Sequence, residues 1–214
     1  MKIKSFIGGY DKNLSYIVWC EETNYAAIID ASVKPEKMID FIIDKNLRIK
    51  KLLITHSHGD HVCFMKDWID YFSDIIVYGY DIKKNNYIKN NIKITNNEII
   101  NIGNELIISL YTPGHYYDSI CFWDQKSRNI FTGDTIFVGR TGRVISNRSS
   151  ISDLYNSIYN VLLKLPEETM IFPGHHYGHV KQISFKDNKV ISDFFNCNSE
   201  SEFIKVMNNF EKNR

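Results

Sequence analysis

Short apolar stretches separated by polar turns recur along the chain and predict a series of strands. Gly103-Asn104 is predicted as the turn between two of them. The predicted strands cover residues 15–20, 25–30, 51–54, 75–78, 99–102, 105–111, 119–124, 129–132 and 169–172.

Apolar residues at helical spacing predict helices over 35–45, 62–72, 152–163 and 199–210. Ser152 and Ser199 are the predicted N-caps of the last two, with Glu202 at the capping-box position. Residues 81–97 are rich in Lys and Asn, and we interpret them as a solvated surface excursion. Helices interleaved with strands predict a layered α/β protein.

Composition narrows the possible functions. The chain has 214 residues and a formal net charge of +1, which argues against a nucleic-acid binder driven by bulk charge. No apolar stretch approaches the roughly 20 residues that span a bilayer, and we expect no signal peptide. The four cysteines form no CxxC pair and are expected to be reduced thiols in the cytoplasm. The oligomeric state is left open.

Histidines and aspartates stand where predicted strands end. The segment THSHGDH follows KKLLI, TPGH follows ELIISLY, TGD follows RNIF, and PGHH follows TMIF. Ligands of α/β sheets gather where strands end and loops begin. Imidazole and carboxylate together suit Zn, Fe or Mn, so convergence of these ends predicts a metal site.

Each of these residues also has a simpler interpretation. Asp60 can cap the following helix, Asp134 can stabilise a turn, and His115 can be a structural histidine. Taken together, these interpretations require five of seven histidines to fall at strand ends by coincidence. His176 and His179 are interpreted as loop residues outside the site.

The motifs THSHGDH, TPGH, FTGDTIF and PGHHYG, in this order, resemble the metallo-β-lactamase superfamily. Within it they resemble the glyoxalase II group (hydroxyacylglutathione hydrolases) and the related persulfide dioxygenases. They span residues 55–177, and the preceding strands and Asp30 also fit. The resemblance implies a four-layer αββα sandwich: a single domain over 1–214 with a short C-terminal helical extension at about 180–214.

Carried over by position, the resemblance implies two divalent metal ions, with zinc as the first expectation and iron or manganese as alternatives. The first ion would be bound by His56, His58 and His115. The second would be bound by Asp60, His61 and His175. Asp134 would bridge both ions, and Asp60 and Asp134 are the predicted catalytic residues. A bridging hydroxide would attack the carbonyl carbon of a small-molecule thioester such as an acyl-glutathione.

Arg143 matches a family position that contacts the thiol substrate, and Tyr177 matches a family tyrosine, so we predict both as substrate-binding residues. Two positions depart from the family: Thr141 replaces a cysteine, and Tyr116 replaces a small threonine. The C-terminal region that supplies basic residues for glutathione is also shorter here. These departures leave the thiol and the acyl group of the substrate open.

The main alternative is a mononuclear iron persulfide dioxygenase, which would use His115, Asp134 and either His58 or His56. Near-neutral charge argues against a nuclease of the same fold. The expected lack of export argues against an antibiotic-degrading lactamase. A complete donor set argues against a non-enzymatic scaffold. We therefore expect an enzyme with no nucleic-acid and no membrane partner.

Overall fold

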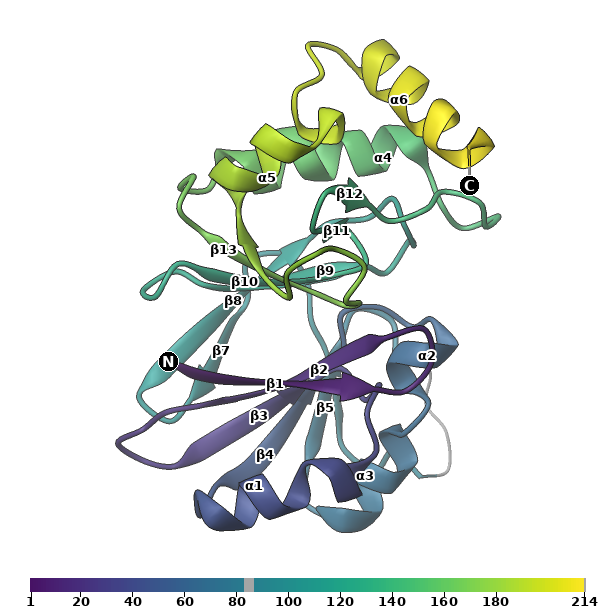
Figure 1. Cartoon of the computed structure of the whole chain (residues 1–214). Coiled ribbons are helices and arrows are strands. Elements are labelled where there is room, and N and C mark those ends of the chain that lie inside the picture. The colour runs from purple at the N-terminus through teal and green to yellow at the C-terminus, as the bar shows by residue number, and fades with distance from the viewer. Residues whose placement is uncertain (83–86, 214) are drawn as a thin grey trace.

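Two sheets packed face to face form the centre of the computed structural model, which describes residues 1–82 and 87–213 (Figure 1). Strands β3 to β6 of the first sheet run parallel, whereas β1 to β3 are antiparallel neighbours. The strands of this sheet, in spatial and chain order, are β1 (Lys2–Gly8), β2 (Asn13–Trp19), β3 (Tyr25–Ile29), β4 (Arg48–Leu53), β5 (Ile76–Gly79) and β6 (Asn91–Lys93).

The second sheet has the order β14-β13-β10-β9-β8-β7. Its strands are β7 (Ile99–Ile102), β8 (Glu105–Tyr111), β9 (Ile120–Asp124), β10 (Asn129–Gly133), β13 (Met170–Pro173) and β14 (Ile183–Ser184). β10 and β13 are parallel, and β8 points the same way because antiparallel β9 lies between β8 and β10. The carboxyl ends of β8, β10 and β13 therefore lie on one side of the sheet. A separate ribbon pairs β11 (Ile136–Phe137) with β12 (Arg140–Thr141).

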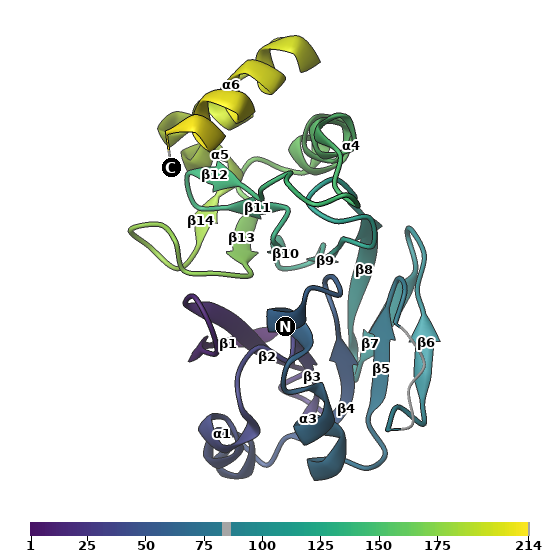
Figure 2. The same ribbon diagram turned by 90° about the vertical axis from the view of Figure 1, so that its right-hand side faces the viewer.

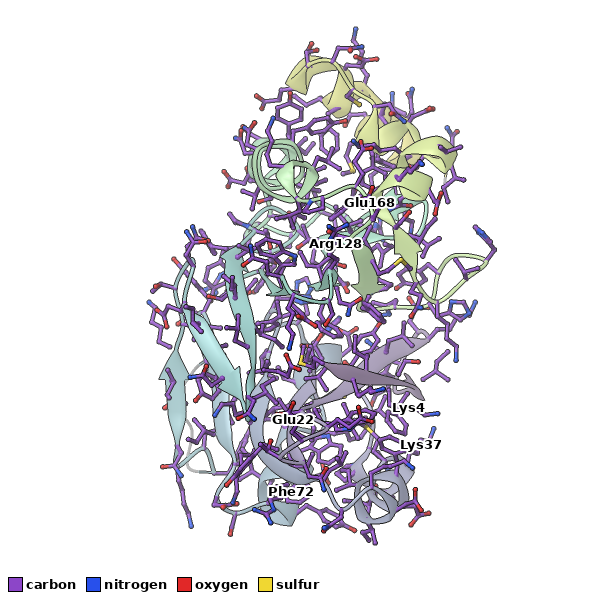
Figure 3. The ribbon with its side chains drawn as sticks, turned by 90° about the vertical axis from the view of Figure 1, so that its left-hand side faces the viewer. Lys4, Glu22, Lys37, Phe72, Arg128 and Glu168 are labelled. Atoms are coloured by element: carbon purple, nitrogen blue, oxygen red, sulfur yellow. The ribbon has the colours of Figure 1, made fainter. Side chains whose placement is uncertain are left out.

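Apolar residues on both faces of each sheet explain the layers. In β2, Tyr16 and Val18 pack between the sheets, whereas Ile17 packs on the opposite side with Trp68. Alternate residues of a strand face opposite sides, so β2 contributes to two cores. Figure 3 shows side chains filling these spaces, with Phe72 in the layer below the first sheet.

Helices cover both outer faces of the sandwich (Figures 1 and 2). α1 and α3 cover the first sheet, and α4 and α5 cover the second. α6 packs on the outer side of α4, where Phe203 contacts Tyr155. The helical segments are η1 (Pro35–Lys37), α1 (Ile39–Asp44), α2 (Gly59–Val62), α3 (Met65–Tyr71), α4 (Ile151–Asn156), η2 (Ser157–Val161), η3 (Leu162–Lys164), α5 (Phe185–Ile191), η4 (Asp193–Phe195) and α6 (Glu200–Lys212). This arrangement confirms the αββα sandwich.

Residues 180–213 contribute β14 to the edge of the second sheet, followed by α5 and α6. The predicted cap of α6 is confirmed, because Ser199 Oγ accepts a hydrogen bond from the Glu202 backbone N–H at 3.3 Å. The Glu202 carboxylate accepts from the N–H of Asn198, one residue before the cap. None of the helices in the described ranges has the length and apolar character that crossing a bilayer requires. All four cysteines are free.

Three predicted helices differ from the structure. The helix predicted at 35–45 is split by Met38 into η1 and α1, and that predicted at 62–72 is split into α2 and α3. In the second case the His61 carbonyl and the Phe64 N–H bond the backbone of Ala31 instead of continuing the helix. The third begins earlier than predicted: Ser150 caps α4, because its Oγ accepts from the Asp153 N–H.

The 81–97 segment is only partly a surface excursion, and its residues 83–86 lie outside the described ranges. Within it, β6 pairs with β5, and Ile88 and Ile94 are buried. Strands β1, β11, β12 and β14 and helix α5 were not predicted.

Candidate metal centre

The turn after β4 brings several donor side chains to the side of the sandwich where α2 lies (Figure 1). His56 is buried in the extended segment after β4, and His58 keeps an extended backbone with φ −62° and ψ 144°. Asp60 and His61 follow in the single turn of α2. Residues 56–61 thus present four donor side chains. Two come from the segment before the helical turn and two from the turn itself.

Three imidazoles form a first donor group. His58 Nδ1 lies 3.0 Å from His56 Nε2 and 3.0 Å from His115 Nε2. His115 reaches this point from the turn after β8. Together the three offer donor atoms that all lie within 4.8 Å of one another, as a cation site requires.

Asp60, His61 and His175 form a second donor group within the same limit. His175 Nε2 lies 3.2 Å from Asp60 Oδ2 and 3.3 Å from His61 Nε2. His175 comes from the turn after β13. The turns after β4 and β13 therefore meet across the two sheets.

Asp134 lies between the two groups. Its Oδ1 is 3.2 Å from His61 Nε2, and its Oδ2 is 3.4 Å from His175 Nε2 and 3.6 Å from His115 Nε2. Oδ1 is buried and accepts no well-aligned hydrogen bond from the described residues. A buried carboxylate oxygen that lies among imidazoles and accepts no well-aligned hydrogen bond fits a bound cation.

Hydrogen bonds behind the donors fix which ring nitrogen faces the centre. The Nδ1 atoms of His115 and His175 lie 2.8 and 2.9 Å from the carbonyl oxygens of Arg143 and Asp11. A carbonyl only accepts, so each Nδ1 donates a proton and each Nε2 is the ring nitrogen that faces the centre. This arrangement is typical of metal-binding histidines.

Two buried residues that sequence analysis gave no role also hold donors. Asp30 Oδ2 accepts from His61 Nδ1 at 2.8 Å. Asn13, which is 0% exposed, donates through Nδ2 to Asp60 Oδ2 at 2.9 Å. Asp30 directly follows β3 just as Asp134 directly follows β10, so the strand-end signal could have found it. Asn13 had only a weak signal, a polar residue beside an apolar strand.

Burial and neighbouring charged groups shift the pKa values of the donor side chains. Burial alone would raise the pKa of the Asp60 carboxyl, but the hydrogen bond with His175 and the charge of His61 hold that pKa well below its usual range. Burial, the largest cause, and the neighbouring His115 lower the pKa of His58 to about 4. Burial opposes charge on His175, yet the hydrogen bonds of its Nε2 with Asp134 and Asp60 raise its pKa to about 9, so a cation bound here would displace the proton from Nε2. Ionised carboxylates and a neutral His58 are the forms that bind metals.

The backbone at Gly174 passes very close to the donor side chains Asp134 and His61. A Cβ there would lie 2.3 Å from Asp134 Oδ1 and 2.7 Å from His61 Cε1. Glycine at this position therefore lets the turn after β13 close against the donors.

The predicted substrate-binding residues, Arg143 and Tyr177, lie next to donor histidines. Each donates hydrogen bonds to a carboxylate. Arg143 donates to Glu211 of α6 through Nε at 3.0 Å and Nη2 at 2.8 Å. The Tyr177 hydroxyl donates to Asp11 Oδ2 at 2.5 Å, and its ring stacks on His175 with centroids 4.8 Å apart. His176 and His179 belong to none of the donor groups.

Comparison with known proteins decides the family. Residues 8–175 match the model of the metallo-beta-lactamase superfamily. The chain belongs to the metallo-beta-lactamase superfamily. The hydroxyacylglutathione hydrolase of Francisella philomiragia is 32% identical over 178 residues, which are 83% of this chain and 68% of the relative. This superfamily member thus spans about two thirds of that relative's length.

Solved structures agree with the fold of this metallo-beta-lactamase superfamily chain. The crystal structure of ETHE1 from Myxococcus xanthus has a TM-score of 0.87 and 26% identity, covering 98% of this chain and 91% of that chain. A metallo-beta-lactamase from Staphylococcus aureus has a TM-score of 0.84 and 27% identity, covering 97% and 67%. The predicted resemblance to the glyoxalase II group and the predicted metallohydrolase class are confirmed.

Proposed function

We propose that this protein is a metal-dependent hydrolase of a small thioester, such as an acyl-glutathione, in the cytoplasm. The observation that carries the proposal is the position of Asp134, which lies within 3.6 Å of histidines from both donor groups. Such a shared carboxylate suits a pair of ions. The names of the curated relatives support a thioester substrate.

The donors fit two cations. His56, His58 and His115 would hold one, Asp60, His61 and His175 the other, and Asp134 would touch both. Two divalent cations, zinc first and iron or manganese as alternatives, would supply a water of lowered pKa and a Lewis acid for the carbonyl oxygen.

The residues of the chain orient the reactants. In the reaction, water adds to the carbonyl carbon, the C–S bond breaks, and a carboxylic acid and a thiol leave. The Asp60 side chain is 31% exposed, against 11% for Asp134. The ionised Asp60 is therefore the carboxylate that can accept a hydrogen bond from the attacking water. Arg143 and Tyr177, which the resemblance marks as substrate-binding residues, would contact the thiol half. The Arg143 backbone and the Tyr177 ring each contact a donor histidine.

The test is metal analysis of protein purified without added metal, combined with hydrolysis of S-lactoylglutathione. We expect close to two metal ions per chain and steady loss of the thioester. Asp134→Ala should lose both, whereas Asp74→Ala, which removes an exposed carboxylate, should keep both. Full metal content in Asp134→Ala would contradict the proposal.

The alternative, a mononuclear iron persulfide dioxygenase, is favoured by one observation. The ETHE1 structure from Myxococcus xanthus has the same fold, with a TM-score of 0.87 and 26% identity. One iron per chain with persulfide-dependent oxygen uptake would replace the hydrolase with this alternative.

A further inference from the structure

A pocket of about 220 Å³ lies beside the first donor group. Loops that follow strands of both sheets line this pocket, together with α2 and the start of α3. The residues that carry the argument are Ser57, Val62, Met65, Ile82, Tyr116 and Arg148.

The pocket wall is continuous with the donor-bearing turns. Ser57 stands between His56 and His58 in the chain, and Tyr116 directly follows His115. The Tyr116 ring is tilted against the His58 ring, with centroids 4.2 Å apart. A group held in the pocket would thus lie next to the proposed first cation.

The lining combines aliphatic side chains with polar groups, and its two charged residues, Asp81 and Arg148, are exposed. Val62, Met65 and Ile82 supply aliphatic surface. Asp81 accepts from the Tyr117 hydroxyl at 2.5 Å, and the Arg148 guanidinium lies 4.8 Å from the centre of the Tyr117 ring. The two charges are opposite in sign and brace the same tyrosine, so the pocket favours an uncharged group.

The volume sets the size of that group. Cavities of about 150 Å³ with apolar linings accommodate benzene. A ring-sized group therefore fits here. A lactoyl group would leave part of the apolar surface uncovered and bring its hydroxyl against aliphatic side chains, which is unfavourable.

We propose that this pocket binds the acyl half of the thioester and selects an apolar, ring-sized acyl group over a small polar one. The inference rests on the proposed thioester hydrolysis. Tyr116 is a determinant of this selectivity, because its ring forms the wall shared with His58. The thiol half would lie on the other side of the centre, towards Tyr177.

The first experiment compares phenylacetyl- and acetyl-thioesters of glutathione by the ratio of their kcat/KM values. Val62→Phe and Ile82→Phe fill the pocket from two different elements and should each lower this ratio about tenfold or more. Ile43→Phe is the matched control, because Ile43 is exposed in a different groove beside α1, and it should leave the ratio unchanged. An unchanged ratio in both filled variants would overturn the proposal.

A second readout does not depend on turnover. The chain has five methionines, of which Met65 lines the pocket. In methyl-labelled, metal-free protein, the uncharged probe phenylacetamide should shift the Met65 methyl NMR signal saturably, acetamide should not, and Val62→Phe should abolish the shift. Absence of the phenylacetamide shift would reject the pocket. A shift without hydrolysis of any thioester would instead reject the proposed function.

Discussion

His61 Nδ1 lies 2.8 Å from Asp30 Oδ2, and both side chains are buried. Asp30 has φ +58°, which residues other than glycine rarely adopt. Its carboxylate also accepts from the Thr55 N–H and hydroxyl, at 2.8 Å each. Since the Thr55 hydroxyl donates to Asp30, it accepts from His56 Nδ1, 3.1 Å away. One carboxylate therefore sets the tautomer of a histidine in each donor group.

Asp30→Asn should weaken metal binding by about 10- to 100-fold, because the amide no longer supplies the charge that supports His61. The measurement is metal competition against a chelator of known affinity. Asp74→Asn removes an exposed acid that pairs with Lys50 and serves as the control. Equal metal affinity in Asp30→Asn and wild type would show that the His61–Asp30 contact is only structural.

Gly174→Ala should expel the metals, because its Cβ would overlap Asp134 Oδ1 and press against His61. The shift needed to relieve this contact should also cost about 1–3 kcal/mol of unfolding free energy. Gly59→Ala is the matched control, since nothing lies within 4 Å of its added Cβ. Metal content and denaturant unfolding separate the two variants. Retained metal in Gly174→Ala would mean that the turn can move without cost.

The position of the donors could be predicted because strand direction fixes it. β8, β10 and β13 point the same way, so His115, Asp134 and His175 emerge on one side. The strand-end signal points to Asp30 as well, but the contacts that Asn13 and Asp30 make could not be predicted in this way. They are hydrogen bonds to Asp60 and His61, which lie far along the chain, and these bonds appear only when the strands are packed.

Several strands and one helix break were not predicted from the sequence, each for its own reason. β11 and β14 contain two residues each, too few to show a period. The alternation of Lys2, Lys4 and the apolar residues between and after them could have revealed β1. Continuous apolar spacing over 62–72 hid the break at Phe64, because that break comes from a backbone bond to Ala31 in another segment.

Metal removal should destabilise the fold, because ions that bind only the folded chain stabilise it by mass action. At a free ion concentration of about 1,000 times Kd this amounts to about 4 kcal/mol. Treatment with a chelator should therefore lower the Tm by about 8–16 °C, and added zinc should restore it. Asp134→Ala should show little response to either treatment. An unchanged Tm after the chelator has removed the metal from the wild type would contradict a structural contribution from the ions.

The Cys121 thiol gives a pH dependence that is independent of the centre. Burial raises the pKa of Cys121 to about 12, against an ordinary value of 9.0. The folded thiol thus stays protonated in a range where the unfolded chain releases the proton. Its contribution to stability is complete below about pH 9 and is lost as pH rises towards 12, by up to about 1.4 kcal/mol per pH unit. Cys121→Ser carries no group that titrates there, so its unfolding free energy should fall less between pH 8.5 and 10.5. Parallel pH profiles of the two proteins, measured by urea unfolding, would show that the Cys121 thiol ionises equally easily in both states.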